Sequence, residues 1–452
     1  MASESRRGRV RLLVSALASL VMVLATPVLG WAHASLVSAD PAASSVVHTS
    51  PSRIRLVFSE ALEAKLGRIS LIGSDGVATK LAASGDPHDV NALVGTVTQP
   101  LPAGTYRVDW RVVSADGHPV EGTYVFTVEP VSAAPSRIAP APVVPPADMH
   151  DMDAANWGPT VLGAPIVPSL LRGLAVGTLM GAAGLLAFLS FLRGADDALP
   201  RRPLAAARWL SVAAALLLIL HHAAWAMNAM PEHRLGYDML SVMLDSGVGR
   251  AELWRSGLSL LAVWAIVLAR RPRIALPFEI GALLVSGYTG HATVMHPMWA
   301  TPAKALHLVA VAVWLGGLLW LLTLDGDDAS RFEGEAQRVS AAALVAVLLV
   351  TLSGLVQVLL FLPTPLDLFR SAYGAVTLAK IVGLLVLIGF GAHHKFRVLP
   401  ALARDAARST AFTSSLRREL AVMTIVVLLG GLLAYVPPPK VAAAATTHVL
   451  AR

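Results

Sequence analysis

Eight long hydrophobic segments constrain this 452-residue chain more than any other feature. Each is long enough to cross a bilayer, which takes about 20 apolar residues in a helix. The segments lie at about 166–192, 204–228, 251–269, 274–295, 303–324, 339–362, 374–394 and 419–436. Only 14% of all residues are charged, whereas a soluble protein has about 25%. The sequence therefore predicts an all-α polytopic bundle of about eight transmembrane helices over residues 166–437, and it excludes an ordinary soluble enzyme.

The basic residues between these segments predict the orientation of the bundle. Loops that follow odd-numbered segments carry 15 Lys and Arg, whereas the other loops and the tail at 438–452 carry 6. Because cytoplasmic loops are enriched in basic residues, both ends of the mature chain should face outward from the inner (cell) membrane. The net charge of +7 is spread over segment ends, so the lipid bilayer is the predicted partner and nucleic acid is not.

Residues 1–32 resemble a secretory signal peptide. Arg6, Arg7, Arg9 and Arg11 precede an apolar run, and small residues stand before a cleavage point after Ala32. Cleavage there makes His33 the new N-terminus. The apolar run is long for a signal, so an uncleaved membrane anchor is the competing interpretation.

Residues 33–130 show the short alternating runs of half-buried strands. Ile54, Leu56 and Phe58 alternate with polar residues, and so do the runs that begin at Tyr106 and Tyr124. Turn signals punctuate these runs, which predicts a small antiparallel all-β sandwich. Residues 131–165 are rich in Pro and Ala and lack periodicity, so they are interpreted as an extended linker.

The most specific group of polar residues in the sandwich is His33 with Asp116 and His118. A free N-terminal His offers its imidazole and its α-amine to one metal ion, and this chelate suits the tetragonal N/O geometry of Cu(II). Asp116 and His118 are two residues apart, so in extended backbone their side chains point to the same side. Alone, Asp116-Gly117-His118 is typical of a turn with an incidental His. Together with His33 it predicts a Cu(II) site.

The sandwich region also resembles a known family, the periplasmic copper-binding protein CopC. The resemblance implies an immunoglobulin-like β-sandwich that holds Cu(II) through His33, Asp116 and His118. Some members add a Met-rich loop for Cu(I), but the stretch near Gly73–Gly85 contains no Met. The matching residues are His33-Ala34-Ser35-Leu36, Asp40-Pro41, Phe58-Ser59-Glu60, Gly104-Thr105-Tyr106-Arg107-Val108-Asp109-Trp110 and Ser114-Ala115-Asp116-Gly117-His118-Pro119.

Residues 166–437 are similar to the copper-resistance membrane protein CopD. The motifs are short, and their order along the chain supports the resemblance. It implies copper handling at the inner membrane, in a fusion of a CopC-like and a CopD-like part. The matching residues are Gly287-Tyr288-Thr289-Gly290-His291-Ala292, Leu306-His307, Trp314-Leu315-Gly316-Gly317, Tyr373-Gly374, Lys380 and Arg417-Arg418-Glu419.

Histidine and methionine side chains gather near the outer ends of the predicted helices. Ionisable groups inside a membrane are costly and usually functional, and imidazole with thioether suits copper in either oxidation state. His291 and Met295 are four residues apart, hence on one helix face, which supports a shared site. The alternative is that these side chains only pack between helices; we favour metal binding for His291 and His307. The predicted membrane copper site comprises His291, His307, Met295, His221, His222, His296 and Met298.

The sequence predicts a copper-binding and copper-transport protein rather than an enzyme, with copper as the bound metal and a periplasmic copper donor as a further candidate partner. The motif Met149-His150-Asp151-Met152 either relays copper along the linker or is a solvated tether, and His393 with His394 forms either an exit site or a basic flank. Two other classes stay open. One is a membrane redox protein, because histidines on adjacent helices also ligate haem; the other is a copper-dependent oxygenase with a chelating N-terminal His.

Overall fold

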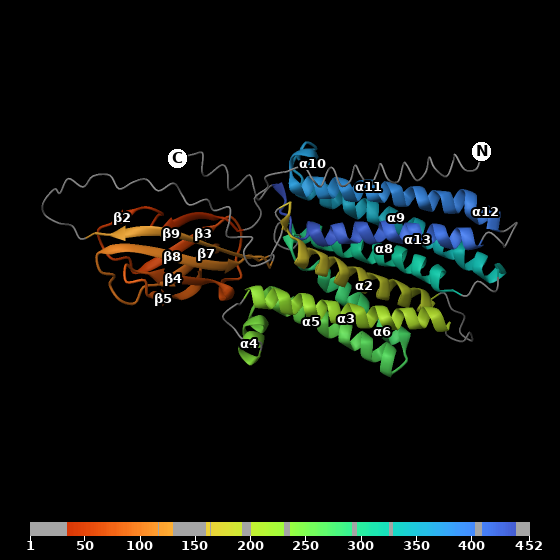
Figure 1. Ribbon diagram of the computed structural model, residues 1–452, viewed down its shortest axis with the longest axis horizontal. Helices are drawn as coiled ribbons and strands as arrows, with labels where there is room; N and C mark the ends of the chain where they lie inside the picture. Colours follow the sequence, from red (N-terminus) through yellow and green to blue (C-terminus); the bar gives the residue numbers. More distant parts are fainter. Residues whose placement is uncertain are drawn as a thin grey trace.

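The structure, a computed structural model, describes residues 34–115, 117–129, 160–162, 164–191, 200–229, 236–291, 296–324, 329–402 and 409–439. The predicted signal peptide, His33, Asp116, Met295, the motif at 149–152 and the end of the tail lie outside the described residues. Figure 1 shows a β-sandwich beyond one end of a long helical bundle. A β-sandwich is therefore followed along the chain by a helical bundle, as the sequence predicts.

Two sheets form the sandwich. The first has the order β1 (Leu36–Asp40), β3 (Arg53–Phe58), β7 (Asp89–Thr96) and β6 (Ala82–Asp86). The second has the order β2 (Val46–Val47), β9 (Pro119–Val128), β8 (Gly104–Val113), β4 (Arg68–Ile72) and β5 (Ala78–Lys80). A short helix, η1 (Ala64–Leu66), follows β3. All pairings are antiparallel except β2 with β9.

Alternating apolar residues build the core between the two sheets. Ile54, Leu56 and Phe58 are buried on β3 while their neighbours are not, because successive strand residues point to opposite faces. The edge of Phe58 packs on Trp110 of β8, with ring centroids 5.0 Å apart. The predicted alternation is confirmed on β3, β8 and β9. Outside the core, a hydrogen bond from Arg55 lowers the pKa of Asp86 below its ordinary value.

The bundle starts after a two-stranded hairpin, β10 (Thr160–Val161) with β11 (Ala164–Pro165). Its helices are α2 (Ile166–Phe191), α3 (Arg201–Ala229), α4 (Tyr237–Asp245), α5 (Gly247–Val263), α6 (Pro272–Gly287), α8 (Pro297–Thr323), α9 (Ala329–Phe361), α10 (Asp367–Arg370), α11 (Ala372–His393), α12 (Leu399–Leu402) and α13 (Ser409–Leu433). Two π-helical turns, η2 (Trp264–Leu268) and η3 (His394–Val398), continue α5 and α11.

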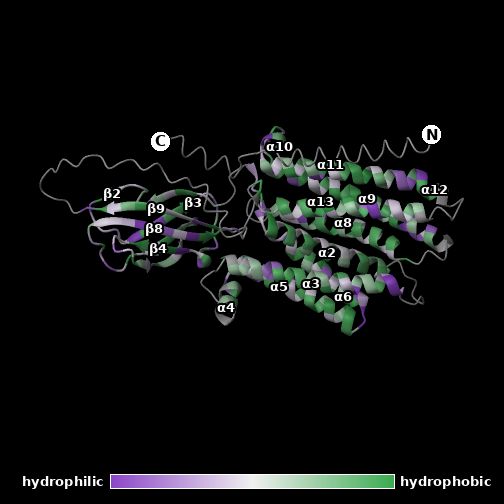
Figure 2. Ribbon diagram, viewed as in Figure 1, coloured by the Kyte–Doolittle hydropathy of each residue, from purple (hydrophilic) through white to green (hydrophobic). Residues whose placement is uncertain are grey.

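Six helices of the described chain are long and apolar enough to cross a membrane, namely α2, α3, α5 with η2, α8, α9 and α11 with η3. The other two predicted segments coincide with α6, which has only 16 residues, and with α13, which carries Arg417, Arg418 and Glu419 in its first half. The protein is therefore a membrane protein with six such helices among its described residues, and the count of eight stays a prediction. Figure 2 shows hydrophobic residues along the length of the bundle.

The helix predicted over 274–295 ends early, at Gly287. Gly287 packs so closely on α8 that an added Cβ would lie 3.0 Å from the Cβ of Ala305. Gly290 then takes a φ of 85°, a left-handed conformation that an α-helix does not contain. His291, which is again helical, therefore lies beyond a break in the backbone that ends α6. Met295 lies outside the described residues, so a shared helix face for His291 and Met295 stays a prediction.

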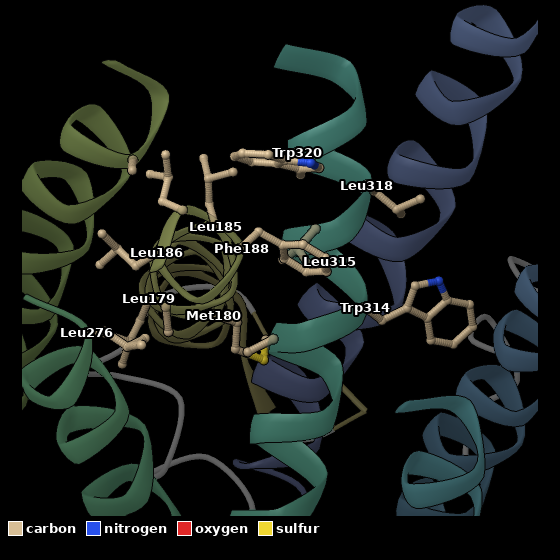
Figure 3. Close-up of a cluster of buried hydrophobic side chains, with 14 of the residues drawn as sticks. Leu179, Met180, Leu185, Leu186, Phe188, Leu276, Trp314, Leu315, Leu318 and Trp320 are labelled. Carbon is tan, nitrogen blue, oxygen red and sulfur yellow. The ribbon is translucent and has the colours of Figure 1, made fainter. Parts of the chain in front are cut away.

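Helix α2 lies between the other helices and holds the bundle together. At Gly184 it approaches Gly316 of α8 so closely that a Cβ on either residue would overlap the backbone of the other helix. Figure 3 shows the large apolar side chains around this contact, including Phe188 of α2 beside Trp320 of α8. Their ring centroids are 6.3 Å apart. This packing joins α2 to α8 toward the later ends of both helices.

Candidate functional site

The sandwich is docked on the end of the bundle through an apolar patch. Leu66 and Val113 of the sandwich pack with Trp225, Ala226, Ala229, Met239, Met243 and Val248 of the bundle. Polar contacts frame this patch. A Glu63 carboxylate oxygen accepts a hydrogen bond from the backbone N–H of Val248, at 3.2 Å, at the start of α5. Lys65 lies 3.5 Å from Asp245. The position of the sandwich is therefore defined by side chains of both parts.

A tight turn between β8 and β9 carries His118 into this junction. The backbone N–H and the hydroxyl of Ser114 both donate to the carbonyl oxygen of His118, at 2.9 and 3.1 Å. Gly117 has a φ of 97°, where a side chain would be strained and would also meet Val248 at 3.1 Å. The indole N–H of Trp225 donates to the carbonyl oxygen of Gly117 at 2.6 Å. The turn is therefore held by Ser114 of the sandwich and by Trp225 of the bundle.

His118 lies at the centre of the junction and contacts two residues of the bundle. Its side chain is buried, with only 4% of the residue exposed. Its ring is stacked on that of His291, with centroids 5.6 Å apart, and meets the ring of Tyr435 edge-on at 5.1 Å. A predicted ligand of the sandwich therefore lies directly against a predicted ligand of the bundle.

The backbone next to His33 and Asp116 converges on one segment of the sandwich. Ser35 exchanges backbone and side-chain hydrogen bonds with Ser59, at 2.9 and 3.0 Å. Ala115 donates to the carbonyl oxygen of Ala61 at 2.8 Å. Ala34 is fully buried. Ser35, two residues after His33, and Ala115, just before Asp116, are thus anchored at Ser59 and Ala61, which are two residues apart on the chain after β3.

Tyr435 forms the floor of the junction and is tied to the interior of the bundle. Its hydroxyl lies 3.0 Å from Nε2 of His221, and the guanidinium of Arg172 lies 5.8 Å from its ring centroid. His221 also has Nδ1 3.3 Å from a guanidinium nitrogen of Arg255, which is paired with Glu252. The same Nδ1 lies 3.9 Å from the Glu252 carboxylate. Nδ1 therefore accepts from Arg255 in one tautomer of His221 and faces Glu252 as a donor in the other.

This arrangement bears on His221 as a predicted copper ligand. A metal ligand needs a free lone pair on a ring nitrogen. Nδ1 of His221 faces Arg255 and Glu252, and Nε2 faces the hydroxyl of Tyr435. Both ring nitrogens of His221 therefore have polar neighbours inside the bundle, and its part in a copper site stays a prediction.

The remaining outer residues of the predicted membrane site differ in exposure. His222 is buried, and its Nε2 has no hydrogen-bond partner among the described residues; its ring lies 6.3 Å from that of Trp225. His296 begins α8, with its ring 6.1 Å from that of Phe361. Met298 is 80% exposed. Of these three, His222 lies beside Trp225, which donates to the carbonyl oxygen of Gly117 in the turn before His118.

His307 lies on another side of α8 from the junction. Its Nδ1 is 3.1 Å from the hydroxyl of Ser353 on α9. Ala305, two residues earlier, faces α6, and two residues correspond to about half a turn of helix. The described polar contact of His307 is thus to α9, and a common metal site with His291 stays a prediction. The Ser353 hydroxyl donates to the carbonyl oxygen of Leu349, so Nδ1 of His307 donates to Ser353 and its Nε2 keeps a lone pair.

At the opposite end of the bundle, His394 of the His393-His394 pair contacts Glu419 of the Arg417-Arg418-Glu419 motif. Its Nε2 lies 2.8 Å from the hydroxyl of Ser415, and its Nδ1 lies 3.1 Å from the carboxylate of Glu419. The indole N–H of Trp314 donates to the same carboxylate at 3.0 Å. His394 thus makes contacts between α11 and α13 through both ring nitrogens, whereas His393 is exposed.

Within the described ranges, no three or more His, Cys, Asp or Glu residues are grouped in a way that could hold a metal ion. His33 and Asp116 lie outside these ranges, so the predicted Cu(II) set stays a prediction. The sequence analysis did not single out Tyr435 or Trp225. A sequence signal for Tyr435 is weak, because it is one aromatic residue among the prolines after α13.

Comparison with known families divides the chain into the same two parts, the sandwich and the bundle. The CopC domain matches residues 36–129, the Copper resistance protein D-like N-terminal domain matches residues 164–300, and Copper resistance protein D matches residues 333–433. The first match covers the sandwich and the other two cover most of the bundle. A copper-handling sandwich joined to a copper-resistance membrane bundle is the class of protein that this fold and its junction define.

Known proteins resemble both the whole chain and its first part. The Copper transport protein CutJ of Bacillus subtilis is 25% identical over 89% of this chain and 74% of its own length. Copper resistance protein C of Escherichia coli is 41% identical over 24% of this chain and 90% of its own length. The solved CopC of Methylosinus trichosporium OB3b is 36% identical over 23% of this chain and 100% of its own, with a TM-score of 0.21. The chain belongs to the CopC/CopD copper-resistance family, as a fusion of the two parts.

The docked junction leads to a first prediction. Trp225→Phe keeps an aromatic ring and removes the hydrogen bond to Gly117, which leaves a buried carbonyl oxygen without its partner. This should cost roughly 1–3 kcal/mol at the junction. We expect hydrogen exchange to quicken roughly tenfold in peptides covering 113–120 and the start of α5, and to stay unchanged in the core of the sandwich. Trp254→Phe, at an exposed position of α5, is the matched control. Equal exchange in both variants would contradict the docked arrangement.

Proposed function

We propose that this protein captures Cu(II) in an outward-facing sandwich at His33, Asp116 and His118, and passes copper directly to the bundle and across the cell membrane. The observation that carries the proposal is the stacking of His118 on His291, with ring centroids 5.6 Å apart. Bonds from imidazole nitrogen to a metal ion are about 2 Å long, so two rings at this separation can bind one ion in turn with small movements. No release into bulk solvent is then required.

Several observations support the capture step. The segment at Ser59–Ala61 anchors the neighbours of His33 and of Asp116, so these two ligands start from one side of the sandwich. His118 is held by the Ser114 turn on that side. Two nitrogens of His33, a carboxylate and an imidazole suit Cu(II). The proposal therefore needs His33 and Asp116 to extend only one or two residues from backbone that is anchored at Ser35 and Ala115.

The orientation and direction of the proposed transfer follow from the bundle. The sandwich is docked at the end opposite His394 and η3, where the basic residues Lys395 and Arg397 lie. The 15 to 6 distribution of Lys and Arg in the loops puts that basic end in the cytoplasm. The relative CutJ is called a copper transport protein. Copper would thus be received outside, at His291 and His222, with His307 as a separate, deeper station.

A haem-binding redox function would use two of the same histidines as axial ligands. His221 is a poor candidate for this purpose, since both of its nitrogens are engaged. An absorption spectrum of the purified chain, with added haem as the positive control, separates the two functions: a haem spectrum contradicts the copper proposal.

Deletion of residues 33–130 behind a working signal tests the proposed function in cells. If the sandwich donates its copper to the bundle, the deletion should reduce copper uptake strongly at low external copper and little when copper is abundant, because the sandwich raises the local concentration of copper above the bundle. Total cellular copper is the measurement, with the full chain and an empty vector as references. Equal uptake by the full and the deleted chain at every copper concentration would show that the sandwich is a buffer and not the donor.

A further inference from the structure

Helix α5 has a polar face turned into the bundle and an apolar face turned out. Glu252, Arg255, Ser256 and Ser259 are all buried. They recur every three to four residues, so they lie on one side of the helix over about 10 Å. The residues at the other positions include Trp254, Leu260, Leu261 and Trp264, which are all about half or more exposed. In a membrane this is a helix that keeps a polar path inside the protein.

The hydroxyl groups along this path are not bonded to their own helix. Ser256 and Ser259 of α5 and Ser211 of α3 are buried, and none of their hydroxyls has a hydrogen-bond partner among the described residues. In contrast, Ser286 of α6 bonds to the carbonyl oxygen of Ala282 in the usual way. Because an unsatisfied hydroxyl in apolar surroundings costs free energy, these groups favour a polar ligand or a cation that passes them.

The inner end of the path is the carboxyl group of Glu279 on α6. Glu279 is fully buried, and neither of its oxygens has a hydrogen-bond partner in the described ranges. Ser211 of α3 is the polar side chain near it, but the two groups do not meet hydrogen-bond geometry. Leu258 of α5 packs against Gly281 of α6; since α5 and α6 run in opposite directions, Ser259 and Glu279 lie within about 1.5 Å of the same depth.

Among the described residues, no positive charge compensates this carboxyl. The ionisable residues on its own helix and on the helices around it are Arg273 of α6, Arg172 of α2, Arg201, Arg202, Arg208, His221 and His222 of α3, Arg250, Glu252 and Arg255 of α5, and Lys304 and His307 of α8. Arg255 is paired with Glu252, Lys304 bonds to Thr289 and Arg208 bonds to the carbonyl oxygen of Ile266. None of these residues forms an ion pair with Glu279 in the part of the chain that the structure describes. An isolated buried carboxylate is very costly, so this group must hold either a proton or a cation.

We propose that Glu279 is a proton-binding site of the bundle, protonated at rest, which loses its proton when a copper ion arrives on the polar face of α5. The O–H bond of the carboxyl breaks, the proton leaves to solvent, and the carboxylate balances one positive charge of the ion. The hydroxyls of Ser211 and Ser259 are hard ligands that suit a proton path better than a resting copper site. The site couples copper movement to protons; this coupling rests on the proposed function, whereas the resting protonation of Glu279 does not.

Infrared difference spectroscopy on the mature chain in liposomes tests both parts. The copper-free protein should show the carbonyl stretch of a buried protonated carboxyl, and this band should be lost in Glu279→Gln and shifted in Glu279→Asp. On copper loading, the band of the unsubstituted chain should fall while a carboxylate band grows. Glu335→Gln is the matched control, because Glu335 is paired with Arg338 and accepts from Trp320 and should leave the band unchanged.

The outcomes separate the two proposals. A band that persists in Glu279→Gln, or no such band at all, overturns the assignment of a resting proton to Glu279. A band that is unchanged although bound copper is measured overturns the coupling and leaves the proposed function standing. If the bundle takes up no copper at all, the proposed function fails and the coupling fails with it, while the band of the copper-free protein still decides the state of Glu279.

Discussion

Adding one alanine before His33 of the mature chain should lower the affinity of the sandwich for Cu(II) more than any single side-chain substitution in it. The extra residue converts the α-amine into an amide. The chelate ring that the amine and the imidazole would form with the metal ion can then no longer form. Changes to outer-shell partners of metal ligands already cost roughly 10- to 100-fold in affinity, and the loss of a ligating nitrogen should exceed this. The chain from Ser35 onward is fixed by Ser59, so the extension should leave the fold of the sandwich unchanged.

The measurement is a competition titration of the mature full chain against a chromophoric Cu(II) chelator, after mass spectrometry has established the N-terminus of both proteins. One alanine inserted within the 131–165 linker is the matched control, and it should leave the affinity unchanged. The same affinity in the extended and the unextended chain would remove His33 from the copper site.

His291→Ala should separate capture from transfer. The sandwich keeps its own ligands, so its affinity for Cu(II) should be unchanged, whereas copper movement into liposomes should fall by at least the roughly tenfold that even an outer-shell partner contributes. His291→Met restores a ligand that suits Cu(I) and should recover part of the movement. His48→Ala, at an exposed position of the sandwich, is the control. Full transfer by His291→Ala would show that His291 is a packing residue.

The strands and most membrane helices could be predicted because their signals are local. Burial alternates along β3 as the residues Ile54, Leu56 and Phe58 do, and α8 spans most of its predicted segment. The end of α6 was missed because the apolar run continues beyond Gly287, and only the close approach of Ala305 and the φ of Gly290 break the helix. Helix α4 was missed because it is short and half polar.

The functional residues also divide into those with a local sequence signal and those whose role depends on contacts between distant parts of the chain. His118 and His291 could be chosen by residue type and spacing, but their contact depends on the docking of two parts that are far apart in the chain. Tyr435 and Trp225 gain their roles only from that contact. The role of His221 depends on Arg255, whose charge is hidden in a segment of high average hydropathy. The polar face of α5 is hidden for the same reason, because a window average does not record which side of a helix each residue takes.

Chelator competition during transfer tests the central claim most directly. The mature chain in liposomes is loaded with one Cu(II) per sandwich, an impermeant chelator is added outside, and copper is measured inside the liposomes. If copper passes from His118 to His291 within the docked junction, the chelator should intercept little copper from the unsubstituted chain and most of it from Trp225→Phe, in which the junction is weakened. Complete interception by the chelator in the unsubstituted chain would contradict direct transfer.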